Sequence, residues 1–109
     1  MPTIPYDMYE SDHELVLVVP FGGVIKESIS ITIQYETITI RGKRVQPKLR
    51  KGFQTLQHQC YRWDVELHID LPPHANYKQM NSNLSKENIL TLIIPKNIIP
   101  DSIPVHIEE

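Results

Sequence analysis

The feature that most limits the fold of this chain is an alternation of apolar and polar residues along several short segments. Apolar side chains occupy every second position in Ile29–Ile33, Thr37–Arg41 and Val65–Leu71. Successive side chains of a β-strand point to opposite faces, so each segment predicts a strand with one buried face. Many of these residues are β-branched, which favours strand over helix. Glu14–Val19 is apolar on both faces and predicts a central strand.

Short turn-forming segments separate the predicted strands. Phe21–Val24 contains two glycines that are free to adopt positive φ, and Gln34–Thr37 is short enough to connect a hairpin. No long stretch has helical spacing, and single helical turns are expected only at Lys26–Ser28 and Asn76–Met80. Many short strands joined by turns predict an all-β sandwich or barrel.

The size and composition of the chain indicate one domain without disulfides. Its 109 residues are enough for one core, and its one cysteine, Cys60, cannot form an internal disulfide and fits a reducing compartment. The first residues lack the basic and apolar regions of a signal peptide. No run approaches the roughly 20 apolar residues of a membrane helix. We therefore expect a cytoplasmic protein without a membrane partner.

The interval from Gly42 to Tyr61 is long and strongly basic. It contains most of a basic cluster between positions 41 and 51, and no acidic residue occurs from Thr37 to Trp63. A cationic surface attracts phosphate groups, but the segment lacks the paired aromatics and the helical period of nucleic-acid-binding proteins. We interpret it as a solvated loop and expect no nucleic-acid partner.

A connection of this length usually carries a function or a strand of its own. Gly52–Gln57, with Phe53, Thr55 and Leu56, predicts a strand held away from the sandwich. A protruding strand can pair with a second molecule. The loop therefore predicts a homodimer.

The C-terminal region divides into a buried strand and a separate tail. Asn88–Lys96 predicts a strand that a proline ends, so we expect a domain over residues 1–97 and an extension over 98–109. In the extension, Ile103 and Val105 project the same way from an extended segment, and Pro104 fixes φ between them. This two-pronged plug suits a groove on a neighbouring subunit and predicts a higher oligomer. The alternatives are packing on its own domain, disorder, or a shifted register over Val105–Ile107.

Six segments in order resemble the small heat-shock protein (α-crystallin) family. The last of them closely follows the family pattern Leu-Ser-x-x-Gly-x-Leu-Thr-x-x-x-Pro-Lys, and the plug lies at the expected distance behind it. The six segments are Tyr6–Asp12, Glu14–Leu17, Phe21–Ile29, Ile38–Arg44, Leu71–Pro73 and Leu84–Lys96, and the plug Ile103–Val105 follows them.

The resemblance implies an immunoglobulin-like sandwich of seven to nine antiparallel strands, with a long loop that carries a dimer-swapped strand. It implies ATP-independent holding of unfolding client proteins, with no enzyme activity and no cofactor. It also implies a groove for the tail between two edge strands. The candidate groove residues are Ile29, Ile31 and Ile33 on one strand and Met80, Ser82 and Leu84 on the other. The alternative is that these six side chains simply fill the core.

The chain departs from the family pattern at four places. Asn88 stands at the position of the glycine, where asparagine still accepts a left-handed φ, and Gly22-Gly23 replaces a Pro-Gly turn. Leu67 lies near the position of a common arginine, whereas Arg62 comes too early. Only a few residues precede Tyr6, where the family has a long apolar arm. For the chain as it stands, we expect small oligomers and weaker holdase activity.

Catalytic and metal sites are not indicated. The five histidines show no metal-ligand spacing, and His68 lies between Glu66 and Asp70 on a polar strand face. His58 and Cys60 have no base-orienting partner nearby in the sequence. Two alternatives to a holdase remain. One is a monomeric CS-type co-chaperone adaptor, and the other is an arm-less subunit that co-assembles with a paralogous small heat-shock protein.

Overall fold

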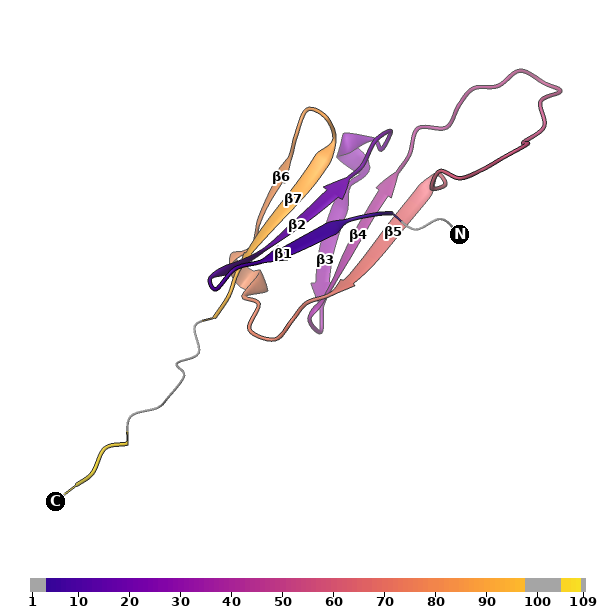
Figure 1. Cartoon of the computed structure of the whole chain (residues 1–109). Helices are drawn as coiled ribbons and strands as arrows, with labels where there is room; N and C mark the ends of the chain where they lie inside the picture. Colours follow the sequence, from indigo (N-terminus) through magenta and orange to yellow (C-terminus); the bar gives the residue numbers. More distant parts are fainter. Residues whose placement is uncertain (1–3, 98–104, 109) are drawn as a thin grey trace.

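The computed structural model describes residues 4–97 and 105–108. These residues form two antiparallel sheets packed face to face, which confirms the predicted all-β sandwich (Figure 1). One sheet has the order β1-β2-β7-β6 and the other has the order β3-β4-β5. The strands are β1 (Asp7–Glu10), β2 (Glu14–Pro20), β3 (Ser30–Gln34), β4 (Thr37–Lys43), β5 (Asp64–Asp70), β6 (Asn81–Leu84) and β7 (Ile89–Pro95).

The predicted turns are where the sequence placed them. Single 3₁₀ turns occupy Lys26–Ser28 and Tyr77–Gln79. The β3–β4 hairpin closes through Tyr35 and Glu36, both with positive φ of 51° and 66°. This pair suits a tight hairpin because two left-handed residues match the twist of the strands. Of the two adjacent glycines only Gly23 has a positive φ, at 80°.

The core lies between the sheets and is entirely apolar among the described residues. The alternation in β4 and β5 places one set of side chains in the core and the other in solvent, as predicted. In β2 and β7, the central pair of their sheet, one set of side chains is likewise buried in the core, whereas most of the alternate positions within the strands are half-buried. The buried side chains are Ile4, Leu15, Leu17, Val19, Phe21, Val24, Ile38, Ile40, Val65, Leu67, Ile69, Leu71, Leu90, Leu92 and Ile94.

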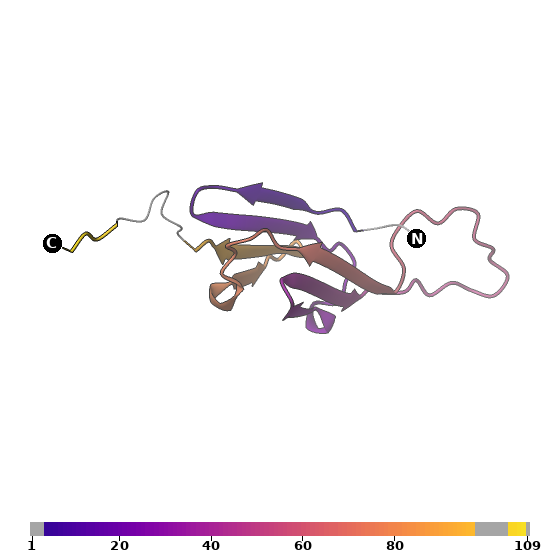
Figure 2. The same cartoon turned by 90° about the horizontal axis from the view of Figure 1, so that it is seen from below.

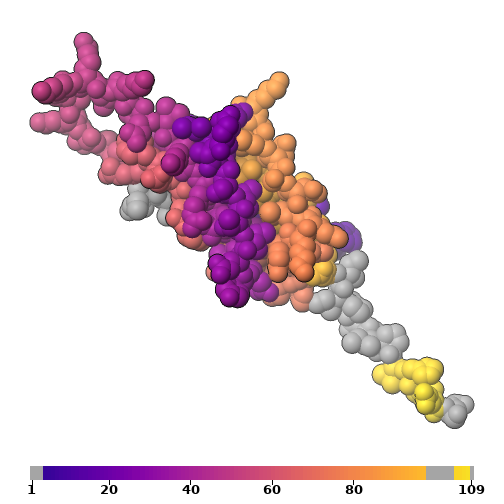
Figure 3. Space-filling model, turned by 180° about the vertical axis from the view of Figure 1, so that it is seen from behind, coloured from indigo at the N-terminus to yellow at the C-terminus, as the bar shows by residue number. Residues whose placement is uncertain are grey.

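Four strands form the free edges of the sandwich: β1 and β6 in one sheet, β3 and β5 in the other. The edges of β3 and β6 lie on the same side of the molecule, as Figures 2 and 3 show. The loop between β4 and β5 projects beyond one end of the sandwich (Figure 2). No helix among the described residues is long and apolar enough to cross a membrane.

Candidate assembly surfaces

The side chains predicted to form a groove lie on the two neighbouring free edges. Ile31 and Ile33 of β3 and Leu84 of β6 are half-buried and pack on the core, as do Ile29 and Met80 just before these strands. They are therefore neither fully in the core nor fully in solvent. The neighbouring strand positions are polar and exposed.

Ser82 differs from the other five groove residues. It lies opposite Leu92, which is fully buried, so its register position faces the core side of the sheet. Nevertheless it is exposed. Ser82 is thus a small, exposed residue at an inward position between the half-buried Met80 and Leu84. Neither β3 nor β6 contains a charged residue.

A lysine links the two edges at one end. Lys26, in the 3₁₀ turn before β3, donates hydrogen bonds from Nζ to the carbonyls of Ser85 and Lys86, at 3.2 Å and 3.4 Å. Ser85 directly follows β6. The two edge strands do not pair with each other, and this contact links them at one end only.

Asn88 adds a second tie near the same end, and sequence reasoning found only half of its role. Its φ of 65° confirms the expected left-handed backbone. In addition, its side-chain amide donates hydrogen bonds to the carbonyls of Phe21 and Val24, at 3.2 Å and 2.8 Å. The backbone N–H of Phe21 in turn donates to the carbonyl of Asn88 at 2.8 Å. A glycine at this position would keep the turn but lose the two side-chain bonds.

The plug residues Ile103 and Pro104 lie outside the described residues. Val105 and Ile107 are described, and they are 83% and 76% exposed. Residues 105–108 form no strand in the single chain. The described part of the tail therefore offers apolar side chains that its own domain does not cover.

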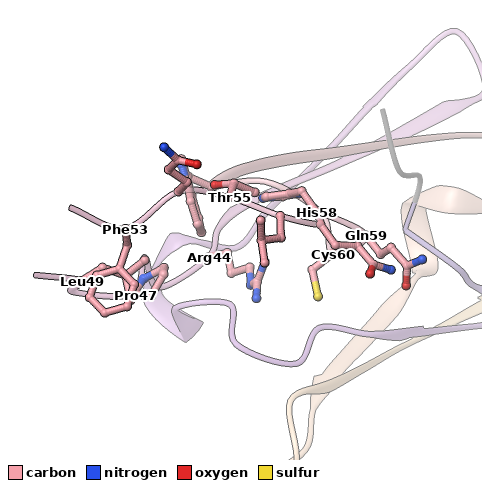
Figure 4. Close-up of a pocket in the computed structure, with 12 residues that line it drawn as sticks. Arg44, Pro47, Leu49, Phe53, Thr55, His58, Gln59 and Cys60 are labelled. Atoms are coloured by element: carbon pink, nitrogen blue, oxygen red, sulfur yellow. The ribbon is translucent and has the colours of Figure 1, made fainter. Parts of the chain in front are cut away.

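The β4–β5 loop exposes apolar side chains along both of its arms. Leu49, Phe53 and Leu56 are 67%, 63% and 95% exposed, and Gly52 turns the chain with a φ of 102°. The two arms enclose a hollow of about 560 Å³, in which Phe53 lies beside Leu49 and Pro47 (Figure 4). The predicted strand over residues 52–57, with Thr55, is not formed within one chain. Its pairing with a second copy stays a prediction.

The base of this loop is fixed by an aromatic cluster that the sequence did not reveal. The Arg44 guanidinium lies 5.5 Å from the ring centre of Tyr61 and 5.7 Å from that of Trp63, distances typical of cation–π contacts. Arg44 also donates from Nη1 to the Tyr61 carbonyl at 2.7 Å, and its backbone N–H donates to Trp63 at 2.7 Å. These contacts hold the two ends of the loop next to each other, at the point where the loop leaves the sandwich.

Tyr61 connects this cluster to the Gly22-Gly23 turn. Its hydroxyl donates a hydrogen bond to the carbonyl of Gly22. Burial raises the pKa of the Tyr61 phenol above its ordinary value, and the nearby positive charge of Arg44 opposes part of this effect. The phenol is thus held in its neutral, donating form.

The polar residues considered for a metal or catalytic site form contacts on the protein surface. On the outer face of β4 and β5, Glu66 accepts from Arg41 at 3.0 Å and lies 2.8 Å from His68 Nε2. Within the described ranges, no three His, Cys, Asp or Glu side chains lie close enough to hold a metal ion. Leu67 is buried in the core, and Arg62 is exposed in the loop. β5, the strand that precedes Leu71, therefore lacks the arginine that is common in the family.

The profile of the Hsp20/alpha crystallin family matches residues 7–108. The chain belongs to this family. This match confirms the family resemblance read from the sequence. The Hsp20 family match includes the described tail residues as well as the sandwich.

Relatives of known name or structure agree with this assignment. Small heat shock protein C4 of Rickettsia felis is 29% identical over 90 residues, covering 83% of this chain and 55% of that protein. The chain thus spans about half the length of this curated relative. A small heat-shock protein from Xylella fastidiosa has a TM-score of 0.75 at 15% identity and covers 98% of this chain and 97% of its own. A Del-C4 mutant of hsp14.1 from Sulfolobus has a TM-score of 0.68 at 26% identity, over 86% of this chain and 76% of its own.

Proposed function

We propose that this Hsp20-family chain is an ATP-independent holdase that assembles through its loop and tail and binds unfolding proteins to prevent their aggregation. The proposal is supported by two kinds of apolar surface, the sheet edges and the tail, that a single chain leaves uncovered. Two uncharged free edges leave half-buried apolar side chains unpaired, while the tail exposes Val105 and Ile107. In one chain these surfaces do not cover each other.

Tail binding at the groove would be weak for a single contact. Burying Ile103 and Val105 contributes about 1.5–3 kcal/mol each, and ordering the tail offsets much of this. Extended backbone can pair with a free edge, and the small exposed Ser82 lies between the apolar Met80 and Leu84 on one of the two edges. Several such contacts within one oligomer reinforce each other through effective concentration. The assembly is therefore held firmly while each plug can still leave.

Release of a plug would uncover apolar surface for a client. A permanently bare apolar edge invites aggregation, so a removable cover explains how the protein stays dispersed and still binds unfolding chains. The same half-buried side chains of β3 and β6 serve both occupants. No nucleotide is needed, because exchange between tail and client requires only thermal motion.

The loop would supply the second contact, between two protomers. Its exposed Phe53 and Leu56 need a surface outside their own chain, and an extended segment around them can add to a free edge of a partner. The cluster of Arg44, Tyr61 and Trp63 directs the loop away from its own sandwich. We therefore assign the loop to dimer formation and the tail to the joining of dimers.

The test is suppression of aggregation without ATP. A heat-unfolded model enzyme is followed by turbidity with increasing amounts of the chain, and the size of the assembly is measured by light scattering in parallel. We expect suppression that saturates with chain concentration, and less of it in the variant Ile103→Ala with Val105→Ala if assembly is needed. Serum albumin at equal mass serves as the control. Unchanged turbidity at any ratio would refute the holdase.

The same measurements separate two other functions. A monomer that leaves turbidity unchanged and binds another chaperone would fit a CS-type adaptor. A chain that acts only after mixing with a full-length paralogous small heat-shock protein would fit a regulatory subunit. The exposed apolar loop and tail favour the holdase over a monomeric adaptor, because a monomer would leave both uncovered.

A further inference from the structure

The hollow enclosed by the two arms of the β4–β5 loop has the size of a small-molecule site. Its volume of about 560 Å³ falls within the range of roughly 300–1,000 Å³ that is usual for ligand pockets. Among the described residues that line it, none is an aspartate or glutamate, and Arg44 is the one lysine or arginine. The hollow therefore combines a single arginine charge with walls that carry no acid.

The apolar and the polar side chains of the lining lie in different parts of the hollow. Pro47, Leu49 and Phe53 lie together towards the tip of the loop, whereas Arg44 and His58 lie nearer its base (Figure 4). The apolar side chains near the tip are largely exposed in the single chain. A ligand with a polar head at the base and an apolar chain towards the tip would match this division.

Two groups at the base of the hollow have hydrogen-bonding capacity that the chain does not use. Arg44 donates from Nη1 to the Tyr61 carbonyl at 2.7 Å and forms no ion pair within residues 4–97 and 105–108, so most of its five N–H donors remain available. His58 Nδ1 is buried and has no hydrogen-bond partner among the described residues. A buried polar atom without a partner destabilises the fold, and an imidazole nitrogen can donate to an anion in one tautomer or when protonated.

Trp63 lies close to both of these groups. Its ring centre is 5.7 Å from the guanidinium carbon of Arg44 and 6.1 Å from the ring centre of His58. Trp63 also lines the hollow and is the one tryptophan of the chain. The planar guanidinium of an arginine suits a carboxylate, which accepts two parallel hydrogen bonds from it. The base of the hollow thus offers donors to a carboxylate beside a fluorescent side chain.

We propose that this hollow is a binding site for an amphipathic anion with one carboxylate and one acyl chain, which is the chemical class of the fatty acids. Arg44 and His58 hold the carboxylate, and the acyl chain covers the exposed apolar side chains towards the tip. The occupant is a single-chain ligand and not a bilayer, because the loop cations that could contact several headgroups at once do not line the hollow. These cations are Lys48, Arg50 and Lys51.

Occupation of the hollow would compete with the loop contact of the proposed function. Phe53 and Leu56 line the hollow and are also the exposed side chains assigned above to dimer formation. A ligand that covers them within their own chain makes them unavailable to a second protomer. This consequence, unlike the site itself, rests on the proposed function, and it makes the anion a regulator of assembly.

The site is tested by titration of the chain with laurate, below the concentration at which laurate forms micelles, while Trp63 fluorescence is recorded. Dodecyltrimethylammonium has a chain of the same length and the opposite charge, and it serves as the control ligand. We expect a saturable change at one laurate per chain and binding of the cation that is at least about tenfold weaker. From octanoate to laurate, the affinity should rise by up to about fourfold for each added methylene. No saturable change with laurate, or equal affinity for both charges, would overturn the proposal.

Two matched pairs of variants locate the site. Arg44→Gln is compared with Arg50→Gln, and Leu49→Ser is compared with Val45→Ser; in each pair the first residue lines the hollow and the second is a loop residue that does not. We expect a loss of laurate affinity of about tenfold or more in the first member of each pair and no loss in the second. If circular dichroism shows that Arg44→Gln is unfolded, His58→Phe takes its place, since it keeps a ring and removes Nδ1. Equal affinities within both pairs would overturn the proposal.

Sedimentation velocity with and without laurate separates the site from its consequence. Dimers that dissociate as the Trp63 signal saturates support both, whereas unchanged dimers at saturation overturn the competition. Phosphatidylserine vesicles test the other source of an anionic amphiphile. Binding to vesicles without binding of free laurate would assign the loop to a lipid surface and overturn the proposal. The turbidity assay is independent of these results, so laurate binding without suppression of aggregation would overturn only the holdase.

Discussion

At the scale of single residues, Asn88 shows how a departure from a family pattern can add a contact. The left-handed φ of 65° is a position that glycine accepts freely and that most other residues accept only with strain. Asn88 accepts the strain and uses its amide to bind the Phe21–Val24 turn. The backbone preference was predictable from the residue type, but the two hydrogen bonds were not, because their acceptors lie far away in the sequence.

Asn88 therefore predicts an ordered series of stabilities. Asn88→Gly should cost about 1 kcal/mol, since it relieves the strain but removes the side-chain bonds. Asn88→Ala should cost about 2–3 kcal/mol, since it keeps the strain and also removes the bonds. Urea unfolding measures both, and Asn83→Ala on the exposed face of β6 is the control. Equal stability of the two Asn88 variants would contradict the role of the backbone.

Tyr61 predicts a dependence on alkaline pH. Burial raises its pKa above the ordinary value of 10.0, so the folded state holds the phenolic proton more tightly than the unfolded state does. The stability from this difference is present below pH 10 and is lost as the pH rises through the raised value. Thermal melting at neutral pH and above pH 10 should show a larger loss for the unchanged chain than for Tyr61→Phe. Parallel losses in both proteins would show that Tyr61 is not responsible.

At the scale of elements, the strands and turns were largely predictable because their causes are local. The period of two in β4 and β5, the helical turn at Lys26–Ser28 and the β3–β4 hairpin all follow from residue types within a few positions. The family resemblance placed the candidate groove residues along β3 and β6, which are free edges in the structure, and binding of the tail there stays a prediction. Their half-buried state could not be predicted, since it depends on how far each sheet covers the other.

The structure of the β4–β5 loop was less predictable from local sequence than the strands and turns. Its length and charge were visible in the sequence, but the contacts of Arg44 with Tyr61 and Trp63 were not. These residues are separated by most of the loop, and only the closed base brings them together. The strand predicted over residues 52–57 has no partner within its own chain, so only an assembled state can test it.

The tail predicts a change in assembly without a change in fold. Ile103→Ala with Val105→Ala should shrink the oligomer measured by light scattering, because the plug loses about 1.5–3 kcal/mol for each apolar side chain. The melting temperature of the sandwich should stay unchanged. Val105→Ala with Ile107→Ala tests the shifted register, and Val45→Ala on the exposed loop is a control for lost apolar surface. An unchanged particle size in both tail variants would refute the plug.

At the scale of the whole molecule, the two segments that we propose as contacts between protomers are separate along the chain: the β4–β5 loop precedes β5, and the tail follows β7. The β3 and β6 edges are uncharged free edges, and we propose them for the tail. Because the proposed contacts use different segments of the chain, we expect either one to form without the other. Assembly should then proceed in two independent steps.

Removing the two contacts separately tests this independence. The tail variant Ile103→Ala with Val105→Ala should stop at dimers, since the loop contact remains. Replacing residues 47–58 by a short Gly-Ser linker should remove the dimer contact without unfolding β4 and β5, because their ends are already adjacent through the 2.7 Å hydrogen bond from Arg44 to Trp63. This chain should still associate weakly through its tail, and the combined variant should be monomeric. If the tail variant alone is already monomeric, the two contacts form one cooperative interface and the separation of steps is wrong.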